Sequence, residues 1–153
     1  MYSSRLSKRN RVLIMADAAR FPFTQMEAPL GEASLLPMLP VTLTYGSNTV
    51  RESALLDTGS IINVLPYTVG VELEAQWARQ TIPVRLTGNL ARLEARALIV
   101  DATVANFPSV RLAFAWTRAE GVPLILGQVN FFKEFDVFFS RSRSFFEVSP
   151  APL

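Results

Sequence analysis

The fold of this chain is decided by one stretch, Ala54-Leu55-Leu56-Asp57-Thr58-Gly59-Ser60-Ile61-Ile62-Asn63-Val64-Leu65. Apolar residues stand on both sides of a polar turn, which predicts two core strands joined by a loop at the edge of a packed core. A carboxylate at Asp57 is costly to bury there and needs hydrogen-bond donors. Gly59 permits a turn that brings its backbone N–H toward that carboxylate. Ser60 can donate a further hydrogen bond, and Thr58 offers a hydroxyl to a neighbouring loop.

Composition narrows the chemistry that this chain can support. Its 153 residues fit one domain, and a hydrophobic fraction of 50% with 18% charged residues is enough for a substantial core. No apolar run approaches the ~20 residues needed to span a bilayer. Cysteine and histidine are both absent, which excludes thiol catalysis, Ser-His and Cys-His pairs and the usual zinc sites within the chain. We therefore expect no metal and no cofactor, and a metal hydrolase is disfavoured because the acidic residues are not clustered.

The positive charge lies in the N-terminal segment. Residues 1–20 hold five Lys/Arg and one Asp, whereas the remainder holds ten Lys/Arg and twelve Asp/Glu. A basic nucleic-acid-binding face on the domain is therefore not expected. The basic start followed by Val12–Ala16 resembles a signal peptide, but this apolar run is shorter than the ~7 residues that such peptides need, so we expect a cytoplasmic protein. Four prolines between Phe21 and Pro40 predict an extended arm over residues 1–40.

Short strands separated by turn residues follow the arm. Val41–Tyr45 alternates between apolar and polar residues, and Gly46-Ser47-Asn48 is typical of a hairpin turn. A helix is expected within 66–77, where Val69, Leu73 and Trp77 are four residues apart, and a short helical turn within 128–133. Further strands are expected at 53–56, 61–65, 82–87, 92–104, 110–116, 123–126, 135–139 and 145–148. The pattern predicts an all-β domain over 41–148, closed into a small barrel, with a tail at 149–153.

A second segment carries a family resemblance together with the first. Pro123-Leu124-Ile125-Leu126-Gly127-Gln128-Val129-Asn130-Phe131-Phe132 has the apolar-apolar-Gly pattern that retropepsin-like aspartic peptidases place after their Asp-Thr-Gly segment. The chain resembles this family, which includes the retroviral proteases, over roughly residues 41–148. The resemblance implies an acid-protease barrel with one short helix near the C-terminus. It also implies that Asp57 is the catalytic carboxylate and that Gly127 braces the active-site loop where two strands cross.

The sequence departs from the family in two places. Retroviral members have a glycine-rich flap hairpin between the two motifs, whereas Val84–Ala91 contains a single glycine. Thr87, Gly88 and Asn89 are the candidate flap, since Gly and Asn tolerate turn conformations. Gln128 follows the second glycine, where many members carry an arginine, so an arginine-based ion pair within the protomer is not expected.

One Asp-Thr-Gly is half of the active site that the resemblance implies. Peptide hydrolysis by this route needs two carboxylates that share one proton, and the other aspartates are followed by Ala, Ala and Val. A two-fold homodimer would supply the second Asp57. We hypothesise that Thr58 joins the two loops by hydrogen bonds and that Ser60 supports its own carboxylate. The predicted function is that of an aspartic endopeptidase acting on an extended peptide or protein held between the dimer and its flaps.

Three other interpretations remain open at this stage. The first is a catalytically silent retropepsin-like module that dimerises or binds peptides. The second is an unrelated β-barrel that binds a small ligand through Asp57, and the third is a plain turn formed by Asp57 and Thr58. A further hypothesis concerns Phe21-Pro22, which joins an aromatic residue to a proline in the arm. This bond is a candidate for self-cleavage, and an ordinary linker proline is the alternative.

Overall fold

The computed structural model describes residues 17–27, 33–119 and 121–153, which form two compact units. One unit runs from Met38 to Lys133, and the other joins the described residues up to Pro37 with Glu134–Leu153. The arm predicted over residues 1–40 lies partly outside the described residues. Its described residues up to Pro37 belong to the second unit, and residues 38–40 begin the first strand of the barrel unit. Within the described residues, no helix combines the length and the apolar character that crossing a membrane requires.

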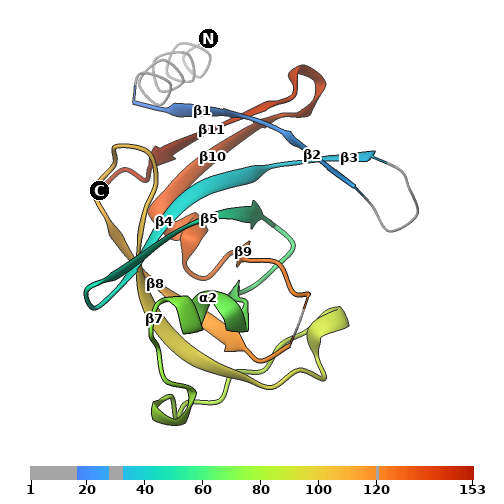
Figure 1. The fold of residues 1–153 in the computed structure, drawn as a ribbon. Helices are drawn as coiled ribbons and strands as arrows, with labels where there is room; N and C mark the ends of the chain where they lie inside the picture. The colour runs from blue at the N-terminus through green and yellow to red at the C-terminus, as the bar shows by residue number, and fades with distance from the viewer. Residues whose placement is uncertain (1–16, 28–32, 120) are drawn as a thin grey trace. The chain divides into compact units, whose positions relative to one another are not determined.

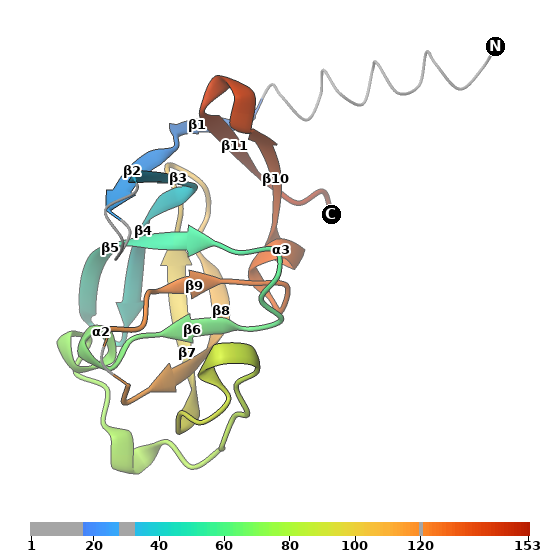
Figure 2. The same cartoon turned by 90° about the vertical axis from the view of Figure 1, so that its right-hand side faces the viewer.

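The first unit is a closed six-stranded barrel with strand order β4-β5-β9-β6-β8-β7 (Figures 1 and 2). Its strands are β4 (Met38–Tyr45), β5 (Asn48–Leu56), β6 (Asn63–Leu65), β7 (Ala95–Thr103), β8 (Val110–Thr117) and β9 (Ile125–Leu126). Most neighbours are antiparallel, but β5 pairs with β9 in parallel and β6 pairs with β8 in parallel. The predicted all-β barrel is therefore confirmed.

The hairpin of β4 and β5 shows how the sequence builds this barrel. Gly46 and Ser47 form a two-residue turn between the paired Tyr45 and Asn48, and Gly46 takes a φ of +59° that glycine adopts without strain. Alternate residues of β4 are buried, namely Leu39, Val41 and Leu43. This period of two is what places one face of a strand in the core.

Four short helical segments lie between the strands in the sequence. They are α2 (Tyr67–Glu72), η1 (Trp77–Arg79), η2 (Gly88–Leu90) and α3 (Phe131–Glu134). In α2, Gly70 lies against the buried Trp116, and a Cβ on this glycine would come within 2.2 Å of the indole. The Trp116 indole N–H donates to the carbonyl of Tyr67, which fixes α2 where β6 ends. The helix predicted within 66–77 is therefore present but stops at Glu72.

The second unit is also built from strands. Its three-stranded antiparallel sheet has the order β1-β11-β10 (Figure 1), with β1 (Ala19–Pro22), β10 (Phe135–Ser140) and β11 (Phe145–Pro150). β10 and β11 are joined through η3 (Arg141–Arg143), and β2 (Thr24–Glu27) pairs with β3 (Ala33–Leu36). The two predicted C-terminal strands exist, but they pair with each other and with β1 instead of extending the barrel.

β1 is held to β11 by side chains as well as by backbone pairing. The Arg20 guanidinium donates to Glu147 Oε1 at 2.6 and 2.9 Å, and the Phe21 ring stacks on Phe146 at a centroid distance of 5.5 Å. The Phe21-Pro22 bond therefore lies in a paired strand. Phe21 is half-buried and Pro22 is exposed in this strand. The arm expected at this bond is therefore a paired strand of a sheet.

Candidate active site

Asp57 leaves the barrel where β5 ends. Its backbone N–H donates to the carbonyl of Leu126 at 3.0 Å, so the start of the loop is fixed to β9. The backbone N–H of Gly59 donates to Asp57 Oδ1 at 2.9 Å, as the sequence predicts. Asp57 is half-buried, while Thr58 and Gly59 are exposed. The carboxylate is thus held in one orientation at the surface of the unit.

Ser60 has a different role from the predicted one. Its hydroxyl donates to the carbonyl of Ile62 at 2.7 Å and not to the carboxylate of Asp57. Its backbone N–H donates to the carbonyl of Asp57 at 3.1 Å, which closes the turn. The correction has a physical reason: the carbonyl two residues on is within reach of a serine hydroxyl in a tight turn, and the Gly59 N–H already serves the carboxylate.

Gly127 lies where the second motif crosses the active-site loop. A Cβ at this position would approach the carbonyl oxygens of Ile62 and Ser60 to 2.6 and 2.7 Å. Both contacts are backbone atoms, so a side chain would displace the loop. The N–H of Gln128 also donates to the carbonyl of Ser60 at 2.9 Å, and the N–H of Val129 donates to that of Ile61 at 2.7 Å. The absence of a side chain at Gly127 is what allows these close backbone contacts.

Asn63 connects the two motifs from inside the barrel. It is fully buried, and its Oδ1 accepts a hydrogen bond of 2.8 Å from the N–H of Gly127. Its Nδ2 donates to the carbonyl of Ala113 at 3.0 Å, while Asn130 Oδ1 accepts from the N–H of Ala113 at 3.1 Å. The sequence analysis did not assign this role. A polar residue within the apolar run 61–65 is the signal that could have found it, because buried amides need partners.

Gln128 makes a further connection between the motifs. Its Nε2 donates to the carbonyl of Thr58 at 2.8 Å, so the amide supports the tip of the active-site loop directly. No positive charge takes part in this contact. The residue that departs from the family pattern therefore still holds the loop, by a neutral hydrogen bond.

The candidate flap forms a loop that returns to the barrel at β7. Pro83 bridges to Arg96, and the N–H of Val84 donates to the carbonyl of Ala95 at 3.0 Å. The strand predicted over 82–87 is reduced to this bridge. Thr87, Gly88 and Asn89 are exposed, and the last two begin the single turn η2, where Gly88 takes a φ of +63°. The hairpin tip expected from the family is replaced by this turn.

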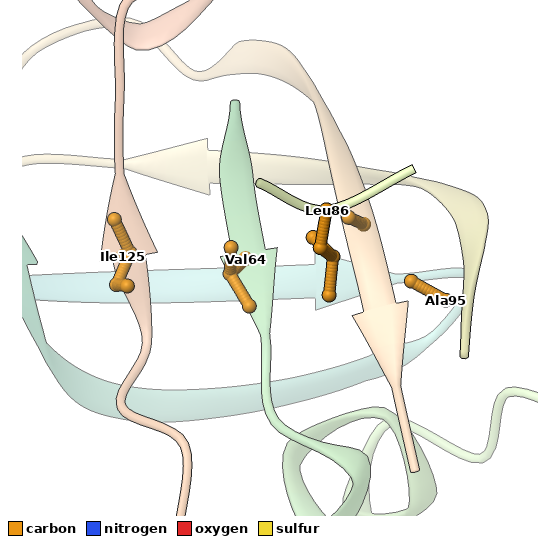
Figure 3. Packing of buried hydrophobic residues seen from close by; sticks show 5 residues of the cluster. Val64, Leu86, Ala95 and Ile125 are labelled. Atoms are coloured by element: carbon orange, nitrogen blue, oxygen red, sulfur yellow. The ribbon is translucent and has the colours of Figure 1, made fainter. Parts of the chain in front are cut away.

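An apolar cluster joins that loop to the strands that carry the active-site loop. Leu86 is buried in one cluster with Val64 and Ile125, and in the view of Figure 3 Val64 lies between the other two. Val64 and Ile125 are paired across β6 and β9. The rest of the cluster is Ala95 and Ala115, with Ile62, Val84, Leu90, Leu93 and Val122 packed around it. The loop 82–95 is therefore anchored by its own apolar side chains beside the strands that flank Asp57.

The described residues hold no group of three acidic side chains that could bind a metal ion. The stretches 58–65 and 123–130 also carry no charged side chain. Asp57, which directly precedes the first stretch and is hydrogen-bonded to Leu126 of the second, is thus the ionisable side chain beside them. A single carboxylate in a rigid loop offers the chemistry of one half of a carboxylate pair.

Comparison with known proteins places this geometry in context. No family model matches the chain, and no curated protein matches it. Among solved structures, a retropepsin-like aspartic protease from Rickettsia conorii aligns with a TM-score of 0.57 at 11% identity, over 86% of this chain and 91% of that one. The retroviral protease-like domain of Ddi1 from Leishmania major aligns with a TM-score of 0.52 at 16% identity, over 76% and 96%.

Proposed function

Because the chain has the retropepsin-like fold, we propose that it is an aspartic endopeptidase whose active site is completed by a second copy of the chain. The observation that carries the proposal is the hydrogen bond from the Gly59 N–H to Asp57 Oδ1. It fixes a carboxylate in a loop that Gly127 and Asn63 brace from behind. A carboxylate held in advance in its working orientation needs little reorganisation during the reaction.

The proposed reaction uses the two Asp57 carboxylates with one proton between them. The ionised carboxylate accepts a proton from a water molecule as the water oxygen attacks the scissile carbonyl carbon. The protonated carboxyl gives its proton to the carbonyl oxygen, so a tetrahedral diol forms. The C–N bond then breaks as the leaving nitrogen takes up a proton, which yields a carboxylic acid and an amine.

The proposed substrate is an extended peptide. Cleavage of a backbone amide requires the segment to be free of its own secondary structure, so that it can lie along the site. The apolar residues around Val64 and Ile125 favour substrates with apolar side chains near the scissile bond. The loop 82–95 would have to separate from part of this cluster to admit them.

The test is hydrolysis of a denatured protein, such as reduced casein, from pH 3 to 8. Asp57→Asn preserves the shape of the side chain and removes the base, so cleavage should fall by at least about 10³-fold. Asp101→Asn, in strand β7, is the matched control and should retain full activity. Cleavage that persists in Asp57→Asn would overturn the proposal.

The same experiment separates the enzyme from a silent module. Peptide binding by the wild-type chain without cleavage at any pH would support a catalytically silent binding module instead. Binding of the same denatured substrate is measured by the change in tryptophan fluorescence.

A further inference from the structure

A small open pocket lies in the barrel unit where β6 leads into α2. It is lined by residues 66–68 and, from the segment between β8 and β9, by Arg118, Ala119, Gly121 and Val122. Its volume is about 400 Å³, which is within the range of sites that bind small molecules. Figure 2 shows α2 and the loop that joins β5 to β6 at opposite ends of β6. The pocket is therefore separate from the candidate active site.

Arg118 brings a positive charge to this pocket. The side chain is exposed, and its guanidinium carbon lies 4.8 Å from the centroid of the Trp77 ring. This cation–π contact holds the guanidinium in place. Arg118 takes part in none of the ion pairs between residues that the structure describes. Its hydrogen-bond donors therefore remain available to a ligand.

Arg96 lies on the same ring but has a different role. Its guanidinium carbon is 4.6 Å from the Trp77 centroid, and its donors bind the carbonyls of Trp77 and Gln80 and the carboxylate of Glu94. The indole N–H of Trp77 is buried and has no acceptor within the described part of the chain. Two donor groups at this ring, the indole and Arg118, therefore lack an acceptor. This excess of donors favours an anionic ligand.

The remaining lining of the pocket suits an apolar body. Pro66, Tyr67 and Val122 contribute most of the apolar side chains, and Thr68 adds a hydroxyl. The Tyr67 ring is fixed because it stacks on the buried Trp116, at a centroid distance of 5.6 Å and an interplanar angle of 11°. Small-molecule sites generally combine an apolar lining with a few polar groups that orient the ligand. The lining therefore fits a molecule with one anionic end and an apolar body.

We propose that this pocket binds a small carboxylic acid, whose carboxylate pairs with Arg118 while its apolar body lies against Tyr67 and Val122. A guanidinium matches a carboxylate by two parallel hydrogen bonds. The one available guanidinium balances a single negative charge, whereas a phosphate group carries more. Because Trp77 already holds Arg118, little side-chain freedom is lost on binding. The proposal does not rest on peptidase activity.

The test is titration of the full chain with 3-phenylpropionate at pH 7, with 3-phenylpropanamide as its uncharged counterpart. The chain has two tryptophans, of which Trp77 contacts Arg118 and Trp116 contacts Tyr67. Binding should therefore change the tryptophan fluorescence, and isothermal titration calorimetry gives the dissociation constant. The acid should bind at least about 10-fold more tightly than the amide, because only the acid forms charge-assisted hydrogen bonds.

Three variants locate the bound acid. Arg118→Gln should weaken its binding by about 10-fold or more. Ala119→Phe fills the pocket and should abolish binding although the charge of Arg118 is kept. Arg111→Gln is the matched control, since Arg111 lies at the other end of β8 with a side chain that is 77% exposed, and it should leave the dissociation constant unchanged. Circular dichroism checks that all three variants are folded.

Several outcomes would overturn the inference. These are no saturable binding of the acid, equal binding of acid and amide, or full affinity in either Arg118→Gln or Ala119→Phe. Asp57→Asn separates this inference from the proposed function. The acid should bind to this variant as it does to the wild type, whether or not the wild type cleaves peptides. Loss of binding in Asp57→Asn would place the ligand at the candidate active site and refute the pocket.

Discussion

Gly127 and Asn63 are 64 residues apart, and the backbone N–H of the first donates to the buried side-chain oxygen of the second at 2.8 Å. This hydrogen bond joins the end of β9 to the start of β6. It lies directly behind the loop that carries Asp57. The position of the Asp57 carboxylate therefore depends on a contact that neither motif makes alone.

The first prediction concerns this hydrogen bond. Asn63→Ala removes one acceptor and one donor inside the barrel, and leaves the Gly127 N–H and the Ala113 carbonyl without that amide. We expect a loss of about 2–4 kcal/mol in the free energy of unfolding, measured by urea denaturation. Asn106→Ala, at an exposed loop position, should change it by less than about 0.5 kcal/mol. Equal effects of the two substitutions would refute the bracing role.

The second prediction concerns the close approach at Gly127. Gly127→Ala places a Cβ atom 2.6 Å from the carbonyl oxygen of Ile62 and 2.7 Å from that of Ser60. Backbone atoms cannot rotate aside, so the active-site loop must shift, at a cost of about 1–3 kcal/mol. Peptidase activity should fall more steeply than stability, because a small displacement of a catalytic group is costly.

The control for Gly127 is Gly46→Asn in the β4–β5 turn. A Cβ there meets nothing within 4 Å, and asparagine tolerates the positive φ of this turn. Activity should be retained in this variant. If Gly127→Ala were as active as Gly46→Asn, the close approach would have no functional importance.

The third prediction concerns the pH dependence of stability. Partial burial of Glu52, together with the nearby negative charge of Glu72, raises the pKa of Glu52 above its ordinary value of 4.5. The folded state then binds its proton more tightly than the unfolded state does. Glu52 therefore lowers the stability as the pH rises from about the ordinary value through the raised pKa.

Glu52→Gln removes this effect and provides the measurement. The variant should be more stable than the wild type at pH 7, and the difference should vanish at pH 3, where both side chains are neutral. Thermal unfolding at the two pH values gives the comparison. Glu94→Gln, at an exposed position, is the control. A difference that is the same at pH 3 and pH 7 would contradict the prediction.

The fourth prediction concerns the attachment of β1. The side chain of Glu147 is only 8% exposed, whereas that of its partner Arg20 is 57% exposed. Arg20→Gln leaves a buried carboxylate without its cation, which should cost about 1–2 kcal/mol after allowance for solvent around Arg20. Amide protons of β1 should then exchange faster with deuterium, as should those of β11 that pair with it.

The same variant tests self-cleavage at Phe21-Pro22. In the wild type this bond is part of a paired strand, so it should resist cleavage, while Arg20→Gln should make it more accessible. Incubation at pH 4 followed by N-terminal sequencing provides the comparison, with an Asp57→Asn background as control. Rapid cleavage of the wild type at this bond would contradict the protective role of β1.

The loop around Asp57 could be predicted because its structure is local. Gly59 lies two residues from Asp57, so the hydrogen bond between them depends on the turn preference of one short segment. The β4–β5 hairpin could be predicted for the same reason, since two turn residues fix its register. The alternation of apolar residues in β4 likewise determines which of its faces is buried.

The remaining features depend on pairing between distant segments, and only the tertiary structure decided them. The Ser60 hydroxyl was expected to support Asp57, but the path of the loop brings it to the carbonyl of Ile62. Asn63 can support the loop only because β9 places the N–H of Gly127 within hydrogen-bond distance of its side chain. β1 pairs with β11, where Arg20 binds Glu147 and Phe21 stacks on Phe146, both more than 120 residues away in the sequence. Local residue preferences determine turns and strand faces, but the choice among distant partners depends on which arrangement buries apolar area and satisfies buried polar groups at once.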